Sequence, residues 1–479
     1  MAVLENLEPK RVFAFFEQMC AIPHGSRNTK QISDWLKAFA DARGLEVHQD
    51  SLGNVIIIKE ASAGYEQAEP VIFQGHMDMV CEKAPDCTRD MAREGLELAT
   101  DGETVWANGT TLGADDGIAV AMALAILDDP ALPHPRFEAV FTVDEEIGML
   151  GAVDLDVSPL RGRRMMNLDS EDEGVFTVSC AGGNITRCVL PVARAPFAGE
   201  ALRLSVGGLQ GGHSGVEIDK GRGNANMLMG RLLYAVSQST DLRLVGVDGG
   251  LKDNAIAQES SAVIVAADGA AVQRVCAQMQ DTLKNELRST DAGVSVTVQP
   301  AEATAAPMDA ASTQKTICLL TCAPNGIQEM SYEIDGLVQT SLNLGVLTTG
   351  EQEVSASFCV RSSVDTQKQM LVERLSCLMA VLGGSAEVSG DYPGWEFQKD
   401  SALRDLMVEV YTEQYGSAPA VEAIHAGVEC GMFAGKLPGL DCVSFGPNLS
   451  EIHTFREHMD VASVQRTWKL VVEILRRMK

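Results

Sequence analysis

The stretch VFTVDEEIGMLG, residues 140–151, is the part of this sequence from which the fold and the site are best inferred. VFTV is apolar and β-branched and predicts a buried strand, and three acids follow it directly: Asp144, Glu145 and Glu146. Adjacent carboxylates repel one another at neutral pH, and burial makes their charges costlier. A buried strand that ends in three carboxylates therefore indicates a functional site whose chemistry needs those carboxylates.

Short apolar segments of the same kind lie on both sides of this stretch. They are typical of buried strands: VIFQG (71–75), FEAVFTV (137–143) and RRMMNLD (163–169). Between the first two lies DDGIAVAMALAILDD (115–129), whose length and apolar character predict a buried helix. Strands that alternate with helices predict an α/β fold with a central, mostly parallel sheet flanked by helices.

Amphipathic patterns near the N-terminus extend this arrangement. They predict helices over residues 8–20 and 28–43, the second ended by Gly44. A strand pair, LEVHQD and NVIIIKE, is expected around the turn SLGN that follows. The α/β pattern thus begins close to the start of the sequence.

The pattern changes around SCAGG, and residues 186–390 are predicted to form an inserted α+β domain with two similar halves. In one half, strands RLSVGG, SAVIVAA and VSVTVQ accompany helices over NANMLMGRLLYAVS and AAVQRVCAQMQDTLKNEL. In the other half, strands TICLLTC, ASFCVRSS and AEVSGDY accompany a helix over TQKQMLVERLSCLMAVLG. The α/β pattern returns at WEFQKDSALRD, so residues 1–185 and 391–479 are expected to form one domain that the insert interrupts.

Composition excludes several classes of protein. The 479 residues include 38 Lys and Arg against 66 Asp and Glu, a formal net charge of −28, which disfavours binding to nucleic acid. We find neither an apolar run of about 18 residues, so no membrane span is expected, nor the pattern of a signal peptide. The 12 cysteines are scattered without CxxC pairs and predict reduced thiols in a cytoplasmic protein.

Imidazole and carboxylate side chains gather at the predicted strand ends and helix starts. His76 and Asp78 follow the strand VIFQG with i, i+2 spacing, so on an extended segment they share one face. Two aspartates open the long helix at 115–116, and Asp169 ends the strand RRMMNLD. Ligands of open α/β sheets bind at the carboxyl ends of strands, and histidines with several carboxylates suit zinc or a similar divalent ion.

Each of these residues also has a simpler explanation when it is considered alone. One aspartate at 115–116 would serve as a helix cap, and a single histidine such as His76 or His453 is more often a hydrogen-bonded core or surface residue. The metal-site interpretation therefore rests on the whole set, which has the composition of a two-metal hydrolase site.

Ordered motifs make the interpretation more specific. The series GHMDMV, LGADDGIA, TVDEEIG, NLD and IHTFRE resembles the di-zinc metallopeptidase family of aminoacylases, glutamate carboxypeptidases and carnosinases. Further motifs, QGHMDMVCEK, GTTLGADDGIA, SCAGG, GGHSGVEI, GRGNAN, IHAGVECG and SFGPNLSEIHT, resemble its branch of aminoacyl-histidine dipeptidases, also called cytosol non-specific dipeptidases or peptidase D. The resemblance covers nearly the whole chain. It implies a di-zinc exopeptidase-type catalytic domain interrupted by a lid domain, the 186–390 insert.

The resemblance also implies a set of metal ligands. One ion would be held by His76 and Asp169, the other by Glu146 and His453, with Asp115 bridging both. The peptide bond that follows the bridging aspartate is expected to be cis. Zinc is the expected ion, although Mn²⁺ or Co²⁺ suits the same nitrogen and oxygen ligands.

Two residues beside the ligands receive catalytic roles from the resemblance. Asp78 would orient His76, and Glu145 would be the general base that moves a proton from the attacking water to the leaving amine. Neighbouring glutamates with divided roles make chemical sense, because a carboxylate that shuttles a proton should not also bind an ion tightly.

The resemblance places the substrate contacts in and near the insert. His213 would stabilise the oxyanion, whereas a loop histidine without a function is the alternative. Asn254 and Arg361 would grip the substrate carboxylate, with a surface strand charge as the alternative for the arginine. Gly427 and Glu429 would line the substrate pocket.

The function that follows is hydrolysis of dipeptides with free termini, including Xaa-His, by a protein that is expected to be a homodimer. The nearest alternative is an N-acyl-amino-acid deacylase or another carboxypeptidase of the same family. A non-catalytic binding protein and a dinuclear aminopeptidase of another fold are further alternatives. The non-catalytic binding protein is disfavoured because Glu145 and all five expected ligands are present together.

Overall fold

The computed structural model describes residues 3–479 and divides into two compact units. The first unit comprises the chain up to Ser179 together with Phe397–Ala423 and Val428–Lys479. The second comprises Cys180–Glu396 and Ile424–Gly427. The domain boundaries expected from the sequence, at 185/186 and 390/391, stay predictions.

An eight-stranded sheet forms the centre of the first unit. Its order is β1 (Glu46–Gln49), β2 (Val55–Lys59), β6 (Phe137–Thr142), β3 (Val71–His76), β7 (Arg164–Asn167), β19 (Asp441–Ser444), β8 (Val175–Cys180) and β18 (Ala420–Ile424). The neighbours β6, β3, β7 and β19 are parallel, whereas β1, β2 and β6 pair antiparallel. The predicted α/β fold is confirmed, with a mixed sheet that is parallel at its centre.

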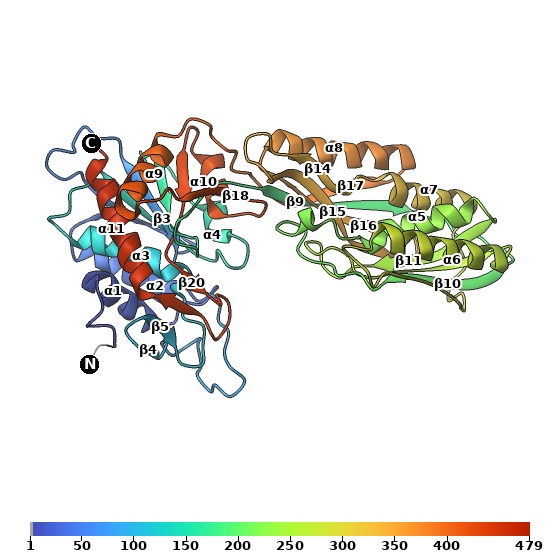
Figure 1. Ribbon diagram of the computed structural model, residues 1–479, viewed down its shortest axis with the longest axis horizontal. Coiled ribbons are helices and arrows are strands. Elements are labelled where there is room, and N and C mark those ends of the chain that lie inside the picture. Colours follow the sequence, from blue (N-terminus) through green and yellow to red (C-terminus); the bar gives the residue numbers. More distant parts are fainter. Residues whose placement is uncertain (1–2) are drawn as a thin grey trace. The chain divides into compact units, whose positions relative to one another are not determined.

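Helices and a small second sheet complete the first unit (Figure 1). The helices are α1 (Lys10–Cys20), α2 (Lys30–Asp41), α3 (Ala114–Asp128), α4 (Leu150–Asp154), α9 (Ala402–Tyr415), α10 (Glu429–Lys436) and α11 (Val461–Arg477). The small sheet has the order β20 (Leu449–Ser450), β21 (His458–Asp460), β5 (Thr104–Ala107) and β4 (Leu98–Thr100). The helices and strands that the sequence predicts for this unit are confirmed, with small shifts at their ends.

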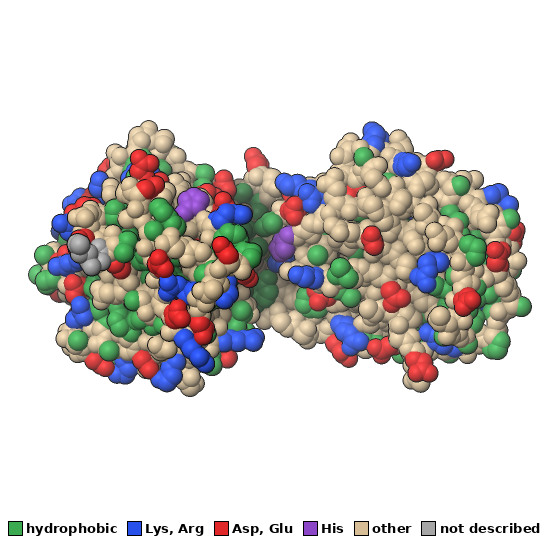
Figure 2. All heavy atoms as spheres, turned by 90° about the horizontal axis from the view of Figure 1, so that it is seen from below, with side chains coloured by type: hydrophobic (Ala, Val, Ile, Leu, Met, Phe, Trp, Pro, Cys, Tyr) green, Lys and Arg blue, Asp and Glu red, His purple; other side chains and the backbone are tan. Residues whose placement is uncertain are grey.

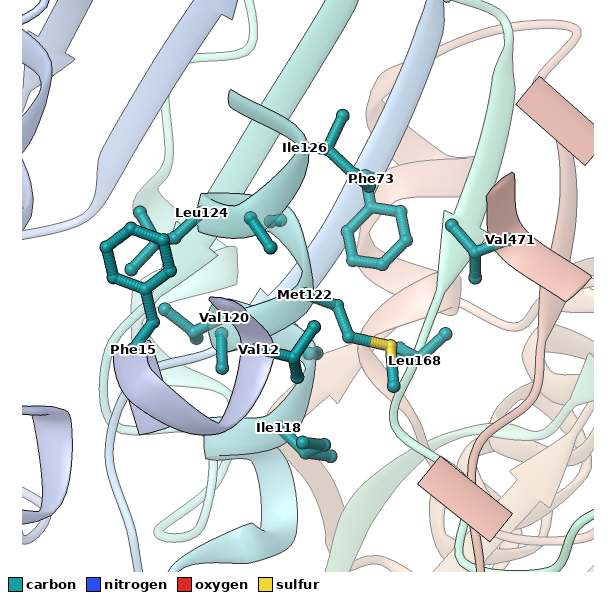
Figure 3. Packing of buried hydrophobic residues seen from close by; sticks show 14 of the residues in the cluster. Val12, Phe15, Phe73, Ile118, Val120, Met122, Leu124, Ile126, Leu168 and Val471 are labelled. Carbon is teal, nitrogen blue, oxygen red and sulfur yellow. The ribbon is translucent and has the colours of Figure 1, made fainter. Parts of the chain in front are cut away.

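Helix α3 is the centre of the hydrophobic core of this unit. Its residues from Ala114 to Leu127 are all buried, as expected for a helix that is apolar on every side. Figure 3 shows Val12 and Phe15 of α1 on one side of α3, and Phe73 of β3 on the other. This packing fixes the position of the helix start, which carries two aspartates.

The second unit is built on a nine-stranded sheet with four long helices (Figure 1). The strands, in sheet order, are β13 (Ser295–Pro300), β10 (Glu200–Gly207), β12 (Ser260–Ala266), β11 (Leu242–Gly249), β15 (Val338–Thr349), β16 (Glu353–Ser362), β9 (Gly182–Pro191) and β17 (Ser385–Tyr392), with β14 (Gly326–Met330) paired to β15. The helices are α5 (Ala225–Ser237), α6 (Gly269–Glu286), α7 (Ala310–Cys322) and α8 (Asp365–Leu382), besides a short 3₁₀ turn at Ile218–Lys220.

The two halves of this sheet have the same topology. The order β13-β10-β12-β11 on one side corresponds strand for strand to β17-β9-β16-β15 on the other. Each half also contains two helices, α5 and α6 or α7 and α8. The halves meet at β11 and β15, where Gly249 pairs with Leu347. In the chain, the first half is inserted between β9 and α7 of the second.

One predicted element of the second unit is wrong. The segment TICLLTC was expected to be a strand, but it forms the end of helix α7. Asp309 caps this helix by accepting a hydrogen bond from the backbone N of Ser312 at 2.7 Å. Ile317 and Leu320 are buried on one face of the helix, three positions apart, and this spacing is the helical signal that the apolar run concealed. Strands β9, β11, β14 and β15 were not predicted.

Charged side chains are mixed over the face of the molecule that Figure 2 shows. Asp and Glu lie among Lys and Arg there, although the sequence has a net charge of −28. Among the described residues, no helix is both long and apolar enough to span a lipid bilayer. The expectation that the protein does not bind nucleic acid stays a prediction.

Candidate metal centre

Three neighbouring strands of the first unit end at one edge of the sheet. Because β6, β3 and β7 are parallel, His76 at the end of β3, the acids after β6 and Asp169 after β7 lie at the same edge. The start of α3 and the loop before β21 add Asp115 and His453. The structure therefore brings together all five residues that the sequence suggests as metal ligands.

Asp115 lies between the two histidines of this group. Its Oδ1 atom is 3.1 Å from Nε2 of His76, and its Oδ2 atom is 3.0 Å from Nε2 of His453. Asp169 Oδ1 is 3.5 Å from the same nitrogen of His76, and Glu146 Oε1 is 3.0 Å from that of His453. The five side chains thus form two groups that share one aspartate.

Asp116 lies in the same cluster, although it is not among the metal ligands that the sequence suggested. The Asp115–Asp116 peptide bond is cis, which confirms the expectation. Asp116 is buried, and its Oδ2 accepts a hydrogen bond from the backbone N of His76 at 3.3 Å. Potential ligand atoms of His76, Asp116 and Asp169 lie within 4.8 Å of one another, as do those of His76, Asp115 and Glu146.

Asp78 contacts His76 mainly through its backbone. Nδ1 of His76 is 3.0 Å from the carbonyl oxygen of Asp78 and 3.5 Å from its Oδ1. The Asp78 carboxylate accepts hydrogen bonds from Ser26 Oγ at 2.8 Å and from the backbone N of Glu145 at 3.1 Å. Asp78 therefore connects the His76 ring to the backbone of Glu145, and Ser26 is a support that the sequence did not reveal.

The three consecutive acids diverge because the backbone turns sharply at the first of them. Asp144 has a left-handed backbone (φ 56°), and its Oδ1 accepts a hydrogen bond from the backbone N of Arg27 at 2.5 Å. The next turn is closed by the N–H groups of Gly148 and Met149, which donate to the carbonyl of Glu145. Asp144 thus has a structural role, and Glu145 and Glu146 remain with the cluster.

The electrostatics of the cluster fit divalent cations. Burial raises the pKa of Glu145 to about 9 and that of Asp116 well above its usual range. Hydrogen bonds to Asp115 and Glu146 raise the pKa of His453 to about 10. Within residues 3–479, the ion pairs of the candidate ligand carboxylates are with imidazoles, and no Lys or Arg joins them. Excess buried negative charge among nitrogen and oxygen donors is what a pair of divalent ions would relieve.

Glu429, at the start of α10, is fully buried and contacts residues of β3 and β6. Its Oε2 accepts hydrogen bonds from Gln74 Nε2 at 2.6 Å and from Thr142 Oγ1 at 2.7 Å, whereas Oε1 has no hydrogen-bond partner among the described residues. Burial raises its pKa to about 7. Gly427 belongs to the second unit, where a Cβ atom at this position would lie 2.7 Å from the ring of Tyr392.

In the second unit, His213 is held in one tautomer. Its Nδ1 accepts hydrogen bonds from the backbone N–H groups of Gly215 and Val216, each at 3.2 Å. Since Nδ1 is an acceptor, the ring hydrogen is on Nε2. Burial and the positive charge of Arg361 lower the pKa of His213. The side chain is therefore a neutral ring that offers an N–H donor.

Arg361 is a buried residue rather than a surface charge. Its side chain donates to Tyr392 Oη at 3.3 Å, and its Nε has no hydrogen-bond partner in the part of the chain that the structure describes. His425 is also buried and contacts Ser341 Oγ through Nε2 at 2.7 Å. Burial, with the positive charge of Arg361, lowers the pKa of His425 to about 3. An unpaired guanidinium N–H beside neutral imidazoles suits an anionic ligand.

Asn254 and His213 line one groove of the second unit, with a volume of about 1040 Å³. The backbone carbonyl of Asn254 accepts a hydrogen bond from the backbone N of Ser214 at 2.9 Å, and its side chain is exposed. The hydrogen bond fixes the Asn254 loop beside the His213 loop.

A mixed α/β unit that gathers two histidines and at least four carboxylates at its strand ends has the architecture of a metal-dependent hydrolase. The chain belongs to Peptidase family M20/M25/M40, whose profile matches residues 72–477.

Two relatives are similar over almost their whole length. The cytosol non-specific dipeptidase of Escherichia coli (strain K12) is 38% identical over 480 residues, which cover 99% of each chain. The crystal structure of an aminoacylhistidine dipeptidase from Vibrio alginolyticus is 36% identical, with a TM-score of 0.94 over 99% of this chain and 97% of that one. An aminopeptidase from Bacillus cereus, at 17% identity, has a TM-score of 0.57 over 98% and 99% of the chains and shows a shared fold.

Proposed function

We propose that this protein is a metal-dependent dipeptidase that hydrolyses dipeptides with free termini, including Xaa-His dipeptides such as β-Ala-His. The observation that carries the proposal is the position of Asp115, whose two carboxylate oxygens contact His76 and His453. Two relatives at 38% and 36% identity, both named as dipeptidases, support it. The protein is further proposed to be a cytoplasmic homodimer.

The metal ligands follow from the two groups that share Asp115. His76 and Asp169 would hold one divalent ion, Glu146 and His453 the other, and Asp115 both. Zinc suits this donor set, as do Mn²⁺ and Co²⁺. Two divalent ions bound there would lower the pKa of a water molecule and polarise the carbonyl of the scissile bond.

Glu145 is the proposed general base. It lies beside the ligand Glu146, and its backbone is fixed by the hydrogen bond to Asp78. The carboxylate takes a proton from the attacking water and gives it to the nitrogen of the leaving amine as the peptide bond breaks. Its raised pKa without cations is consistent with a group that holds a proton readily.

Most of the residues proposed to contact the substrate belong to the second unit. The Nε2–H of His213 would donate to the oxyanion of the tetrahedral intermediate, because Nδ1 is already an acceptor. Arg361 and Asn254 would bind the substrate carboxylate. Gly427 and Glu429 are also proposed to contact the substrate. Glu429 belongs to the first unit, and its Oε1, which has no hydrogen-bond partner among the described residues, would accept from the α-ammonium group.

The proposal is tested with a panel of substrates for the zinc-loaded protein: β-Ala-His, Gly-Leu, Gly-Gly-Leu and N-acetyl amino acids. We expect rapid hydrolysis of the two dipeptides, slow or no hydrolysis of the others, and loss of activity in excess chelator. Cleavage of only the acylated substrates would identify a deacylase instead. Tripeptide hydrolysis at the rate of dipeptides would identify an aminopeptidase.

A further inference from the structure

Glu457 is a buried carboxylate with no role in the proposed reaction, yet its contacts are unusual. Its Oε2 accepts hydrogen bonds from the backbone N–H groups of Leu112 at 2.8 Å and Gly113 at 3.1 Å, and its Oε1 accepts from Ala114 at 2.8 Å. The residue is 3% exposed. One side chain therefore binds the three consecutive N–H groups that precede Asp115.

These N–H groups belong to the start of α3, where a helix has no backbone acceptors of its own. The N-cap position is Gly113, which has no side chain to accept from them. Helix caps usually come from the same segment, but Glu457 lies 345 residues beyond Leu112 in the sequence. The backbone that leads directly into Asp115 is therefore fixed from a distant loop.

The same loop carries His453, four residues before Glu457. The backbone N of Glu457 donates to the carbonyl of Thr454 at 3.1 Å, and Thr454 Oγ1 donates to the carbonyl of Glu451 at 2.8 Å. His453 has a left-handed backbone with φ 59°. A compact turn thus holds the His453 ring and the Glu457 carboxylate in a fixed relation.

We propose that Glu457 is a positioning residue that holds His453 against Asp115 and thereby sets the affinity for one ion of the pair. The proposal rests on the proposed metal centre. The proposed ligands His453 and Asp115 come from a loop and from the start of α3, and Glu457 lies on that loop and accepts hydrogen bonds from the residues before Asp115. In contrast, His76 ends β3 and Asp169 follows β7, two paired strands in the centre of the sheet. Loss of the Glu457 carboxylate should therefore weaken the ion at His453 more than the ion at His76.

The test compares Glu457→Gln and Glu457→Ala with the unchanged protein. Metal-free protein is titrated with Co²⁺ by calorimetry in the presence of a competing chelator, and the visible absorption of the bound Co²⁺ is recorded. We expect two ions in all three proteins, with one ion bound about 10- to 100-fold less tightly in the variants and the affinity for the other nearly unchanged. Glu457→Gln keeps one acceptor oxygen and should show the smaller loss. The absorption of the Co²⁺ ion that loses affinity should also change.

Glu138 provides the matched control. Its buried carboxylate also accepts from consecutive backbone N–H groups, those of Arg161 at 3.0 Å and Gly162 at 2.9 Å, but it lies at the start of β6, away from the strand ends that carry the ligands. Glu138→Gln should lower the unfolding temperature of the metal-free protein and leave both affinities unchanged.

Each outcome decides a different claim. If the unchanged protein binds fewer than two ions, the proposed metal centre itself is wrong. If it binds two, and Glu457→Gln binds both with unchanged affinity and spectrum, the positioning role is wrong. An equal loss of affinity in Glu138→Gln would also overturn it, because the effect would then be one of general stability. Should Glu457→Ala fail to fold, Glu457→Gln decides alone.

Discussion

His453 and Asp115 are 338 residues apart in the sequence, and His453 Nε2 lies 3.0 Å from Asp115 Oδ2. The contact joins the loop before β21 to the start of α3. Since the other oxygen of Asp115 contacts His76, one aspartate connects three separate segments of the first unit. A site of this kind exists only when that unit is fully folded, and the proposed function depends on it.

Asp115 should be required for both ions. We expect Asp115→Asn, which keeps the shape but removes the charge, to bind less than one ion per chain and to lose at least about 10³-fold in kcat/KM, because both groups of ligands lose their shared carboxylate. Metal content by atomic emission after gel filtration measures this. Asp144→Asn is the matched control, since that carboxylate binds the Arg27 backbone, and it should retain two ions. Two ions in Asp115→Asn would contradict the bridging role.

Glu145 and Glu146 should respond differently to the same substitution. Glu145→Gln is expected to keep both ions and lose about 10²- to 10⁴-fold in kcat, because the proton carrier is removed while the ligands stay. Glu146→Gln is expected to lose the ion at His453, because Oε1 of Glu146 lies 3.0 Å from Nε2 of His453. Metal content and dipeptide hydrolysis are measured on both variants. The reverse pattern would mean that the two roles are exchanged.

His213 should affect the chemical step without affecting the metals. The tautomer fixed by Gly215 and Val216 leaves Nε2–H as the donor, so His213→Ala should lower kcat by about 10²- to 10³-fold with two ions retained. Steady-state kinetics with Gly-Leu, together with metal analysis, provide the measurement. An unchanged kcat would mean that His213 lines the groove but does not stabilise the oxyanion.

His425 should make the metal-free protein less stable in mild acid. Its pKa is about 3 in the fold, where burial and the positive charge of Arg361 oppose protonation, against 6.5 ordinarily. Between these values the unfolded chain binds a proton that the folded chain does not, so the free energy of unfolding falls as pH falls below 6.5. From pH 7 to 5.5 this contributes a loss of about 1 kcal/mol.

His425→Gln tests this contribution. Glutamine keeps a hydrogen-bonding group near Ser341 but has no proton to gain, so the variant should lose about 1 kcal/mol less than the unchanged protein over the same pH range. Urea unfolding of both proteins at the two pH values, with chelator present, gives the difference. An identical pH dependence would mean that His425 is protonated in the fold.

The sequence predicts best what depends on local pattern. The strands before His76, Glu145 and Asp169 are recognisable from apolar runs, and parallel strand ends then place these residues at one edge. The segment TICLLTC was misread because an apolar run with Thr and Ile resembles a strand, whereas its helical spacing and the cap at Asp309 decide the structure. Apolar character alone does not separate the two.

Long-range contacts could not be derived from the sequence. The capping of α3 by Glu457 and the support of Asp78 by Ser26 involve residues 345 and 52 positions apart, and no periodicity marks such pairs. The motif IHTFRE contains Glu457, four residues after His453. Without knowledge of the fold, this spacing suggests only that the two side chains would be neighbours on one face of a helix. Similarly, the left-handed backbone of Asp144 is needed to see why three adjacent acids have separate roles.

The most direct test of the account is to restore zinc to the chelator-treated protein in steps and to follow hydrolysis of β-Ala-His and Gly-Leu. We expect no activity without metal, and full activity when two ions are bound per chain at the residues grouped around Asp115. In Asp115→Asn, the same additions should restore nothing. Full dipeptidase activity in the chelated protein, or its restoration in Asp115→Asn, would contradict the central claim.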